Sequence, residues 1–141
     1  MKTNLSRKIL VVCPSVPKPD CNSGDRRFFA ILQLLVKHYS VNLWVPSGLL
    51  TDPESLLYIK QVSELQVNVL DEISCINKVL AQDYYDAIFF EFYAMAELFI
   101  DICRIYQPYA RLVIDSVDVS FARELIASEL GLIKKEQAQQ T

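Results

Sequence analysis

The chain has 141 residues, 52% of them hydrophobic and 22% charged, a composition typical of a globular protein with enough apolar residues for one buried core. Its net charge of −3 leaves no basic surface field of the kind that nucleic-acid binding requires. No apolar run reaches the length of about 18 residues that a membrane span needs, because Glu91 and Glu97 interrupt the most apolar region, so we expect no transmembrane helix.

The N-terminal residues and the cysteines indicate a cytoplasmic protein. Residues 1–8 lead directly into an apolar strand pattern and lack the apolar core of a signal peptide. The four cysteines have no C-x-x-C spacing and no neighbouring histidine, so we predict no zinc site, and we expect neither another metal nor a cofactor. We interpret all four as buried or half-buried thiols: Cys13, Cys21, Cys75 and Cys103.

The first unit of the chain is a strand, a long loop and a helix. A continuous apolar run of β-branched character at residues 9–13 predicts a strand buried on both faces. The next residues contain three prolines, which exclude a regular helix and favour a stiff, extended loop. Ser23 or Asp25 can cap the following helix, which is predicted to reach residue 37 or 38.

A second strand is predicted at residues 41–45, and a second helix follows it. Asp52 is a cap candidate, and Pro53 suits a first helical position, so we expect the helix to begin there and to reach residue 65. Four apolar residues are predicted to face inward from this helix: Leu56, Leu57, Ile59 and Val62.

The second half of the chain continues the alternation of strands and helices. Strands are predicted at residues 67–70, 87–91 and 111–115, and helices at residues 71–81, 95–106 and 120–135, before a frayed tail at residues 136–141. This alternation predicts an α/β fold: a three-layer α/β/α, doubly wound parallel sheet of about five strands. The expected strand order is 3-2-1-4-5, within one Rossmann-like domain that spans residues 1–141.

In such a sheet the ligand crevice lies at the carboxyl ends of the strands that flank the topological switch point, here the first and the fourth strands. Gly24 lies at a helix start, where free N–H groups can bind a phosphate, and Arg26 or Arg27 can add a guanidinium contact. The alternative is that Gly24 only makes a turn while Asp25 caps the helix. The sequence contains neither G-x-G-x-x-G nor a P-loop motif.

Acidic residues follow the later strands at the same predicted edge. Glu91 interrupts an apolar strand, so it must lie at the strand end or be paired. Asp115 and Asp118 could bind a metal, but we favour helix capping and loop hydrogen bonds for them. His38, the only histidine, is expected on the far side of the sheet, which excludes it as the base of a Ser-His-Asp or Cys-His scheme.

Three segments together resemble the N-terminal domain of GT-B glycosyltransferases of the family-4 type. The first is the strand with its proline-rich loop, the Gly and Arg that follow, and the helix that leads to H-x-x-V at residues 38–41. The second is YDAIFFEF at residues 85–92, and the third is ARLVIDSVDV at residues 110–119 with Arg123-Glu124. The three segments occur in the same order as in the family, and the resemblance covers nearly the whole chain.

This resemblance implies a domain that lies on the acceptor side of a transferase, facing a second Rossmann-like domain that holds most of a nucleotide-sugar donor. It implies a donor diphosphate loop formed by Ser23, Gly24, Arg26 and Arg27. The residues expected on the acceptor side are Glu91, Tyr93, Asp115 and Asp118. The catalytic residues stay unassigned, because many family members carry a histidine after the fourth strand, where Glu91 to Tyr93 stand here.

The same resemblance implies which partners the chain would have, and it leaves alternative functions open. The chain is too short to include the donor domain, so we expect it to be inactive alone and to act with a nucleotide-sugar donor and a sugar or other hydroxyl acceptor in a longer enzyme. Peripheral contact with a membrane and a homodimer through the exposed interdomain face or the C-terminal helix stay open. The alternative function is a non-catalytic α/β interaction or regulatory module. A receiver-like domain is disfavoured, because no acidic cluster follows the first strand.

Overall fold

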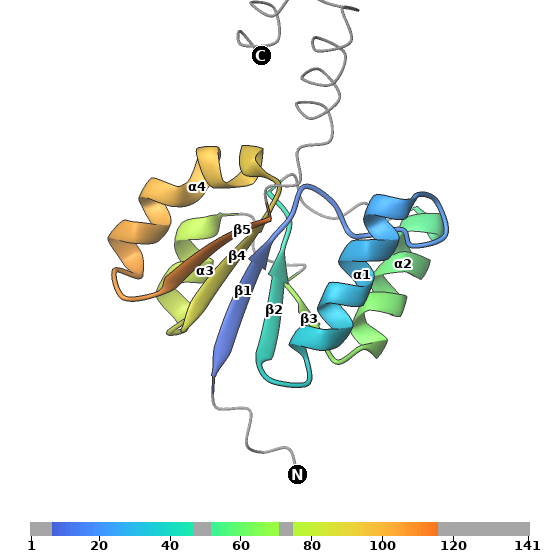
Figure 1. Cartoon of the computed structure of the whole chain (residues 1–141), viewed down its shortest axis with the longest axis horizontal. Helices are drawn as coiled ribbons and strands as arrows, with labels where there is room; N and C mark the ends of the chain where they lie inside the picture. The colour runs from blue at the N-terminus through green and yellow to red at the C-terminus, as the bar shows by residue number, and fades with distance from the viewer. Residues whose placement is uncertain (1–6, 47–51, 71–74, 116–141) are drawn as a thin grey trace, which may run out of the picture.

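A computed structural model of the chain describes residues 7–46, 52–70 and 75–115. Its centre is a five-stranded sheet in the order β3-β2-β1-β4-β5, in which each pair of neighbouring strands is parallel (Figure 1). The strands are β1 (Lys8–Val12), β2 (Ser40–Trp44), β3 (Asn68–Val69), β4 (Ala87–Glu91) and β5 (Arg111–Asp115). The predicted fold class and strand order are confirmed.

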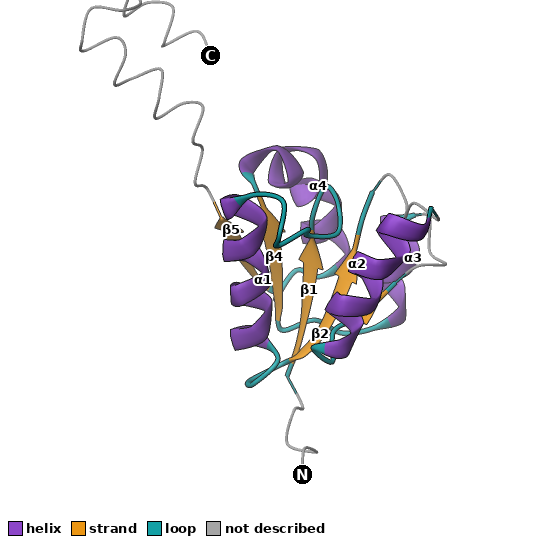
Figure 2. Ribbon diagram, turned by 90° about the vertical axis from the view of Figure 1, so that its right-hand side faces the viewer, coloured by secondary structure: helices purple, strands orange, loops and turns teal. Residues whose placement is uncertain are grey.

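Helices cover both faces of this sheet and give the three predicted layers. They are α1 (Ser23–Leu35), α2 (Pro53–Glu64), α3 (Ile76–Gln82) and α4 (Tyr93–Tyr106). The helices α1 and α2 lie on one face, and α3 and α4 lie on the other (Figures 1 and 2). The predicted helix at residues 120–135 and the tail at 136–141 lie outside the described residues. No helix in the described ranges is long and apolar enough to cross a membrane.

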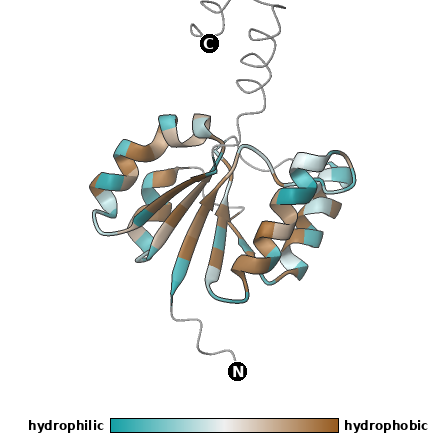
Figure 3. Cartoon of the chain, viewed as in Figure 1, coloured by the Kyte–Doolittle hydropathy of each residue, from teal (hydrophilic) through white to brown (hydrophobic). Residues whose placement is uncertain are grey.

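The alternation of side chains along β1 and β4 divides the core into two clusters. Ile9 and Val11 pack with Phe28 and Leu32 of α1, whereas the side chains between them in β1 face α3 and α4. Because both faces of the central strands are covered, β4 is buried along its whole length, and the apolar sides of the helices turn toward the sheet (Figure 3). Polar groups can therefore reach solvent only near the two ends of these strands.

The two long helices on the first face begin with side-chain caps. The side chain of Asn22 accepts a hydrogen bond from the Asp25 N–H at 2.7 Å, so Asn22 is the N-cap of α1. The predicted caps Ser23 and Asp25 were wrong, because both residues lie inside the first turn. At α2 the prediction is confirmed: Asp52 accepts from the Ser55 N–H, and Pro53 occupies the first helical position.

Several helical details differ from the sequence predictions, among them the start of α4, which begins at Tyr93 and not at residue 95. The helix α1 ends at Leu35, two or three residues early, and single turns then lead into β2. In α2, the predicted inward residues Ile59 and Val62 do pack against the core, whereas Leu56 and Leu57 are about half exposed and Tyr58 is buried in their place. The cause is the hydroxyl of Tyr58, which lets this amphipathic side chain lie inward with its polar end at the surface.

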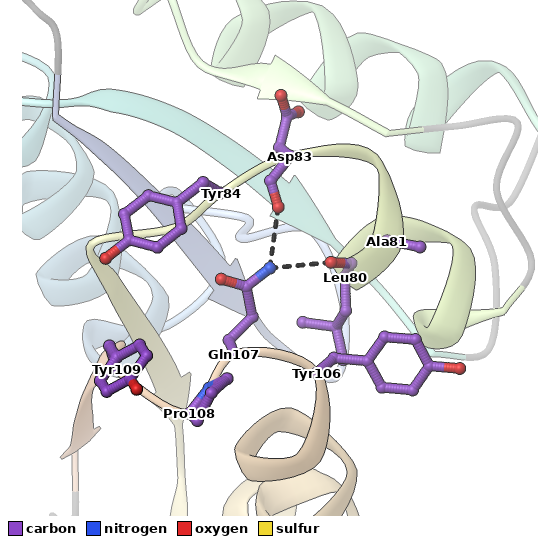
Figure 4. Close-up of a pocket in the computed structure, with 8 residues that line it drawn as sticks. All are labelled: Leu80, Ala81, Asp83, Tyr84, Tyr106, Gln107, Pro108 and Tyr109. Atoms are coloured by element: carbon purple, nitrogen blue, oxygen red, sulfur yellow. Dashed lines mark hydrogen bonds between the residues drawn. The ribbon is translucent and has the colours of Figure 1, made fainter.

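A buried glutamine ties together the loops at the N-terminal edge of the sheet. Gln107, which follows α4, donates from its side-chain nitrogen to the carbonyl oxygens of Leu80 and Asp83, each at 2.8 Å (Figure 4). Its side-chain oxygen accepts from the Tyr85 N–H at 3.1 Å. Gln107 also lines a pocket of about 430 Å³ that three tyrosines border. One side chain thus satisfies three backbone groups, one in α3 and two in the loop between α3 and β4.

Replacing this glutamine should destabilise the fold. We expect Gln107→Ala to lower the free energy of unfolding by about 3 kcal/mol, because a buried polar group that loses its partner costs about 1–3 kcal/mol. Urea unfolding followed by circular dichroism would measure the change. Gln33→Ala, at an exposed position of α1, is the control and should change the value by less than about 0.5 kcal/mol. Equal effects of the two substitutions would contradict this role of Gln107.

Candidate functional site

Three ionisable side chains lie at the carboxyl ends of neighbouring strands, on the face of the sheet that α1 covers. Cys13 directly follows β1, Glu91 ends β4 and Asp115 ends β5. Glu91 and Asp115 are register partners, and Cys13 belongs to the core cluster on the α1 face. Since alternate residues of a strand share a face, Glu91 lies on the same face as Phe89, which packs against Phe28 of α1. All three side chains thus point toward one helix.

The helix α1 is joined to β5 by a bidentate ion pair at this edge. The two terminal nitrogens of Arg27 donate to the two carboxylate oxygens of Asp115, at 2.7 and 3.2 Å. The Arg27 side chain is half exposed, whereas that of Asp115 is only 9% exposed. The hydrogen bonds that Arg27 donates to the Asp115 carboxylate raise the pKa of Arg27, so this pair stays charged. It fixes the start of α1 over the ends of β4 and β5.

Glu91 is a buried carboxyl group without a hydrogen-bond partner among the described residues. The residue is 4% exposed, and no hydrogen bond or ion pair to its side chain occurs in the described part of the chain. Burial, followed by the negative charges of Asp25 and Asp115, raises the pKa of Glu91 to about 8, and the charge of Arg27 opposes this shift only in part. At neutral pH most molecules therefore carry a protonated Glu91, which can donate a hydrogen bond.

The loop after β1 folds back onto the start of α1. The carboxylate of Asp25 accepts from the Lys18 N–H at 2.9 Å, and the Arg26 side chain donates to the Pro19 carbonyl at 3.3 Å. Arg26 was predicted near a phosphate, and Asp25 was predicted as a helix cap. In the structure their side chains hold the loop instead, so Arg26 is not directed toward Glu91 or Asp115. Of the two candidate arginines, Arg27 is the one that reaches the carboxylates.

The same loop is also attached to α2. The Tyr58 hydroxyl donates to Asp20 at 2.5 Å, and the Cys21 sulfur lies 3.5 Å from that hydroxyl oxygen. The ammonium group of Lys18 lies 5.7 Å from the centre of the Tyr58 ring. The hydrogen bond lowers the pKa of Asp20 and raises that of Tyr58. The loop is therefore held by two helices.

The first turn of α1 leaves two backbone donors available. Asn22 satisfies the Asp25 N–H, whereas the N–H groups of Ser23 and Gly24 have no acceptor among the described residues. Both residues are exposed. A Cβ atom on Gly24 would meet only the Asn22 side-chain oxygen, at 3.3 Å. This turn can accept an anion, because the free N–H groups and the helix dipole both favour negative charge.

The turn from β4 into α4 has an unusual backbone conformation. Phe92, between Glu91 and the first residue of α4, has φ of 76° and ψ of 145°. Such a conformation costs a residue with a side chain on the order of 1–3 kcal/mol, and such strain is concentrated at functional sites. The Phe92 N–H donates to the Asp115 carbonyl at 3.2 Å, which ties this turn to the end of β5.

The predicted site residues thus divide into three groups. Arg27, Glu91 and Asp115 come together, with Asp25 close enough to affect the pKa of Glu91. Ser23, Gly24 and Arg26 lie in the adjoining turn of α1, and Tyr93 is exposed at the start of α4. Asp118 lies outside the described residues. His38 is exposed in the turn that precedes β2, at the opposite edge of the sheet, as predicted. Within the described ranges, no three His, Cys, Asp or Glu side chains are arranged to hold a metal ion.

Sequence reasoning missed several contributors to this region. Asn22 could have been identified, because asparagine is as good an N-cap as serine or aspartate. Cys13 was interpreted only as a buried thiol, yet burial and the charges of Glu91 and Asp25 raise its pKa well above the usual value. No sequence signal marked Phe92, since a positive φ is expected at glycine. Lys18 contributes its backbone N–H, which no side-chain pattern reveals.

Compared with known proteins, the chain matches no family model, no curated protein and no solved structure.

The buried carboxyl group should make stability depend on pH. The unfolded chain releases the Glu91 proton near pH 4.5, whereas the folded protein holds it to about pH 8, so the folded state binds more protons in this window. The free energy of unfolding should therefore fall as pH rises through it, by on the order of 4 kcal/mol. Urea unfolding of the wild type and of Glu91→Gln would measure this, and the fall should be absent in the variant. Glu97→Gln, at an exposed position of α4, should retain the wild-type profile.

The cysteines should divide into two reactive and two protected thiols. Cys21 and Cys75 are exposed, contrary to the prediction that all four are at least half buried, whereas Cys13 and Cys103 are buried. Burial raises the pKa of Cys103 to about 12. With an aromatic disulfide reagent at pH 8, we expect two thiols to react within minutes and the other two only after unfolding. Rapid reaction of all four thiols in native buffer would contradict the described burial.

Proposed function

We propose that the chain is the acceptor-side Rossmann-like domain of a GT-B glycosyltransferase, which transfers a sugar from a nucleotide-sugar donor to a hydroxyl acceptor. The observation that carries the proposal is the position of Glu91, a buried carboxyl group without a hydrogen-bond partner in the described chain, beside the first turn of α1. This edge of the sheet, at the switch between β1 and β4, is where doubly wound folds bind ligands. The resemblance of the three sequence segments supplies the reaction class.

In this proposal the first turn of α1 faces the donor diphosphate. The N–H groups of Ser23 and Gly24 supply uncharged donors, and the helix dipole adds a favourable potential for an anion. Arg27 supplies the positive charge. Its guanidinium group is half exposed, so it retains donors beyond the two that contact Asp115. These groups would stabilise the negative charge that develops on the leaving diphosphate.

Glu91 would contact the acceptor hydroxyl. A carboxyl group with a pKa of about 8 can donate a hydrogen bond at neutral pH, and its ionised form can accept a proton from a hydroxyl group. Tyr93, exposed two residues later at the start of α4, would line the acceptor side of the same edge. The strained Phe92 between them fixes the direction in which the chain leaves β4. No histidine takes part in this proposal, because Glu91 to Tyr93 stand where many members of the resembled family carry one.

One observation favours the alternative, a non-catalytic α/β module. Asp115 engages Arg27 at both terminal nitrogens, an arrangement that is also typical of a purely structural link between a helix and a strand. In that case the first turn of α1 would bind no nucleotide, and Glu91 would affect only stability. The two functions therefore differ in whether a nucleoside diphosphate binds at this turn.

Titration of the isotope-labelled chain with uridine diphosphate and with guanosine diphosphate would test the proposal. We expect one of them to shift the amide resonances of Ser23 and Gly24, with weak affinity, because these N–H groups are open donors. Gly24→Val places a branched side chain over the turn and should weaken binding by tenfold or more. Ala30→Val, at an exposed position further along α1, is the matched control and should bind as the wild type does.

Two outcomes would overturn the transferase proposal for this site. In the first, neither nucleotide shifts the resonances of Ser23 to Arg27 at millimolar concentration. In the second, Gly24→Val binds as tightly as Ala30→Val. Either result would favour the non-catalytic module, provided that circular dichroism shows both variants to be folded.

A further inference from the structure

A second polar hollow lies at the opposite, N-terminal edge of the sheet. It has a volume of about 340 Å³ and is lined by Arg7, Tyr39, Asp86, Ala87 and Arg111. None of these residues belongs to the edge that carries Glu91. The hollow is therefore separate from the site proposed above, and its chemistry is independent of that function.

The register of the sheet brings two arginines to this hollow. Arg7 directly precedes β1 and Arg111 begins β5, with β4 between these strands. Ala87 is the register partner of Arg111, and Ile9 is the partner of Ala87. Since alternate residues of a strand share a face, the side chains of Arg7, Ala87 and Arg111 lie on the α1 face. The small methyl group of Ala87 leaves space between the two longer side chains.

Hydrogen bonds fix the backbone at this edge, whereas the guanidinium groups of the two arginines have no partner among the described residues. The Ser40 N–H donates to the Arg7 carbonyl at 2.8 Å, and the Arg111 N–H donates to the Asp86 carbonyl at 3.0 Å. By contrast, both arginine side chains are exposed, and within the described residues neither makes a hydrogen bond or an ion pair. Their donor groups are open, on strand ends whose positions are set by the sheet.

The charge around the hollow is positive on balance. Two guanidinium groups face one carboxylate, that of Asp86, and one oxygen of this carboxylate accepts from the Lys8 N–H at 2.8 Å. Lys8 itself is paired with Asp83 at 3.1 Å, so it adds no free charge. Tyr39, in the turn between α1 and β2, adds a hydroxyl group to the lining. The hollow therefore offers two planar charged donors and one neutral donor.

We propose that this hollow binds an oxyanion of the phosphate class. A guanidinium group presents paired N–H donors that match two oxygens of one phosphate, and two such groups on either side of a small residue can hold the same anion. The ligand is either a phosphate group on a small molecule in solution or the phosphate headgroup of a membrane lipid. Both would use the same donors, and they differ in whether binding occurs at a vesicle surface.

The experiment uses the whole chain and two probes. Inorganic phosphate is titrated at constant ionic strength while the side-chain N–H resonances of the arginines are followed, and binding to vesicles of phosphatidylcholine with phosphatidic acid is measured by sedimentation. We expect saturable binding in at least one of these two measurements. The double variant Arg7→Gln/Arg111→Gln should lower the affinity tenfold or more. Lys60→Gln/Lys78→Gln removes the same charge from exposed positions of α2 and α3 and should bind as the wild type does.

A substitution that should increase the affinity distinguishes binding at this hollow from non-specific attraction of anions to positive charge. Asp86→Asn removes the opposing carboxylate and keeps an oxygen that can accept from the Lys8 N–H, so it should tighten binding about threefold or more. Saturation by inorganic phosphate alone assigns a soluble ligand, and binding to vesicles alone assigns a lipid headgroup. Absence of binding in both measurements, or equal losses in the two double variants, would overturn the proposal.

Discussion

The central constraint in this molecule is that β1 and β4 are covered on both faces. Every side chain of β4 is buried, and the residues of β1 divide between two apolar clusters. A polar group in the middle of such a strand would lose its hydration without gaining a partner, which is costly. Ionisable groups are therefore confined to the strand ends. The two edges of the sheet are where chemistry can occur, and they differ: one carries acidic residues and the start of a helix, and the other carries arginines.

At the acidic edge, one ion pair determines the surroundings of the buried carboxyl group. Arg27 compensates Asp115 through two hydrogen bonds, so its charge opposes the raised pKa of Glu91 only in part. Burial first, and the charges of Asp25 and Asp115 second, raise the pKa of Glu91, so most molecules carry it protonated at neutral pH. The same pair links α1 to β5, so the position of the helix and the protonation of Glu91 depend on one contact.

Sequence patterns predicted the sheet well, because four of the five strands are short, mainly apolar runs bounded by turn residues, whereas β3 is only Asn68–Val69. The bounds of β4 and β5 agree with the prediction at both ends, and right-handed crossovers left one favoured strand order. The edge at which Glu91 and Asp115 meet followed from the same reasoning, since parallel strands end together. That part of the candidate site needed no knowledge of side-chain packing.

The remaining features depend on three-dimensional packing that a periodic pattern does not determine. In α2 the prediction was right for Ile59 and Val62 but wrong for Leu57, which is about half exposed, while the neighbouring Tyr58 is buried and donates to Asp20. Likewise, either Arg26 or Arg27 could have reached the carboxylates. The rotation of α1 about its axis selects Arg27 and directs Arg26 to the loop.

The loop after β1 has a further consequence for ligand binding. Asp25 holds it at the Lys18 N–H, and Tyr58 holds it at Asp20, so it is attached to two helices before any ligand arrives. A loop that must become ordered on binding loses conformational entropy, and this loss lowers affinity. Here that loss is already incurred during folding. A small anion at the first turn of α1 would meet a preorganised surface, and most of its interaction energy would contribute to affinity.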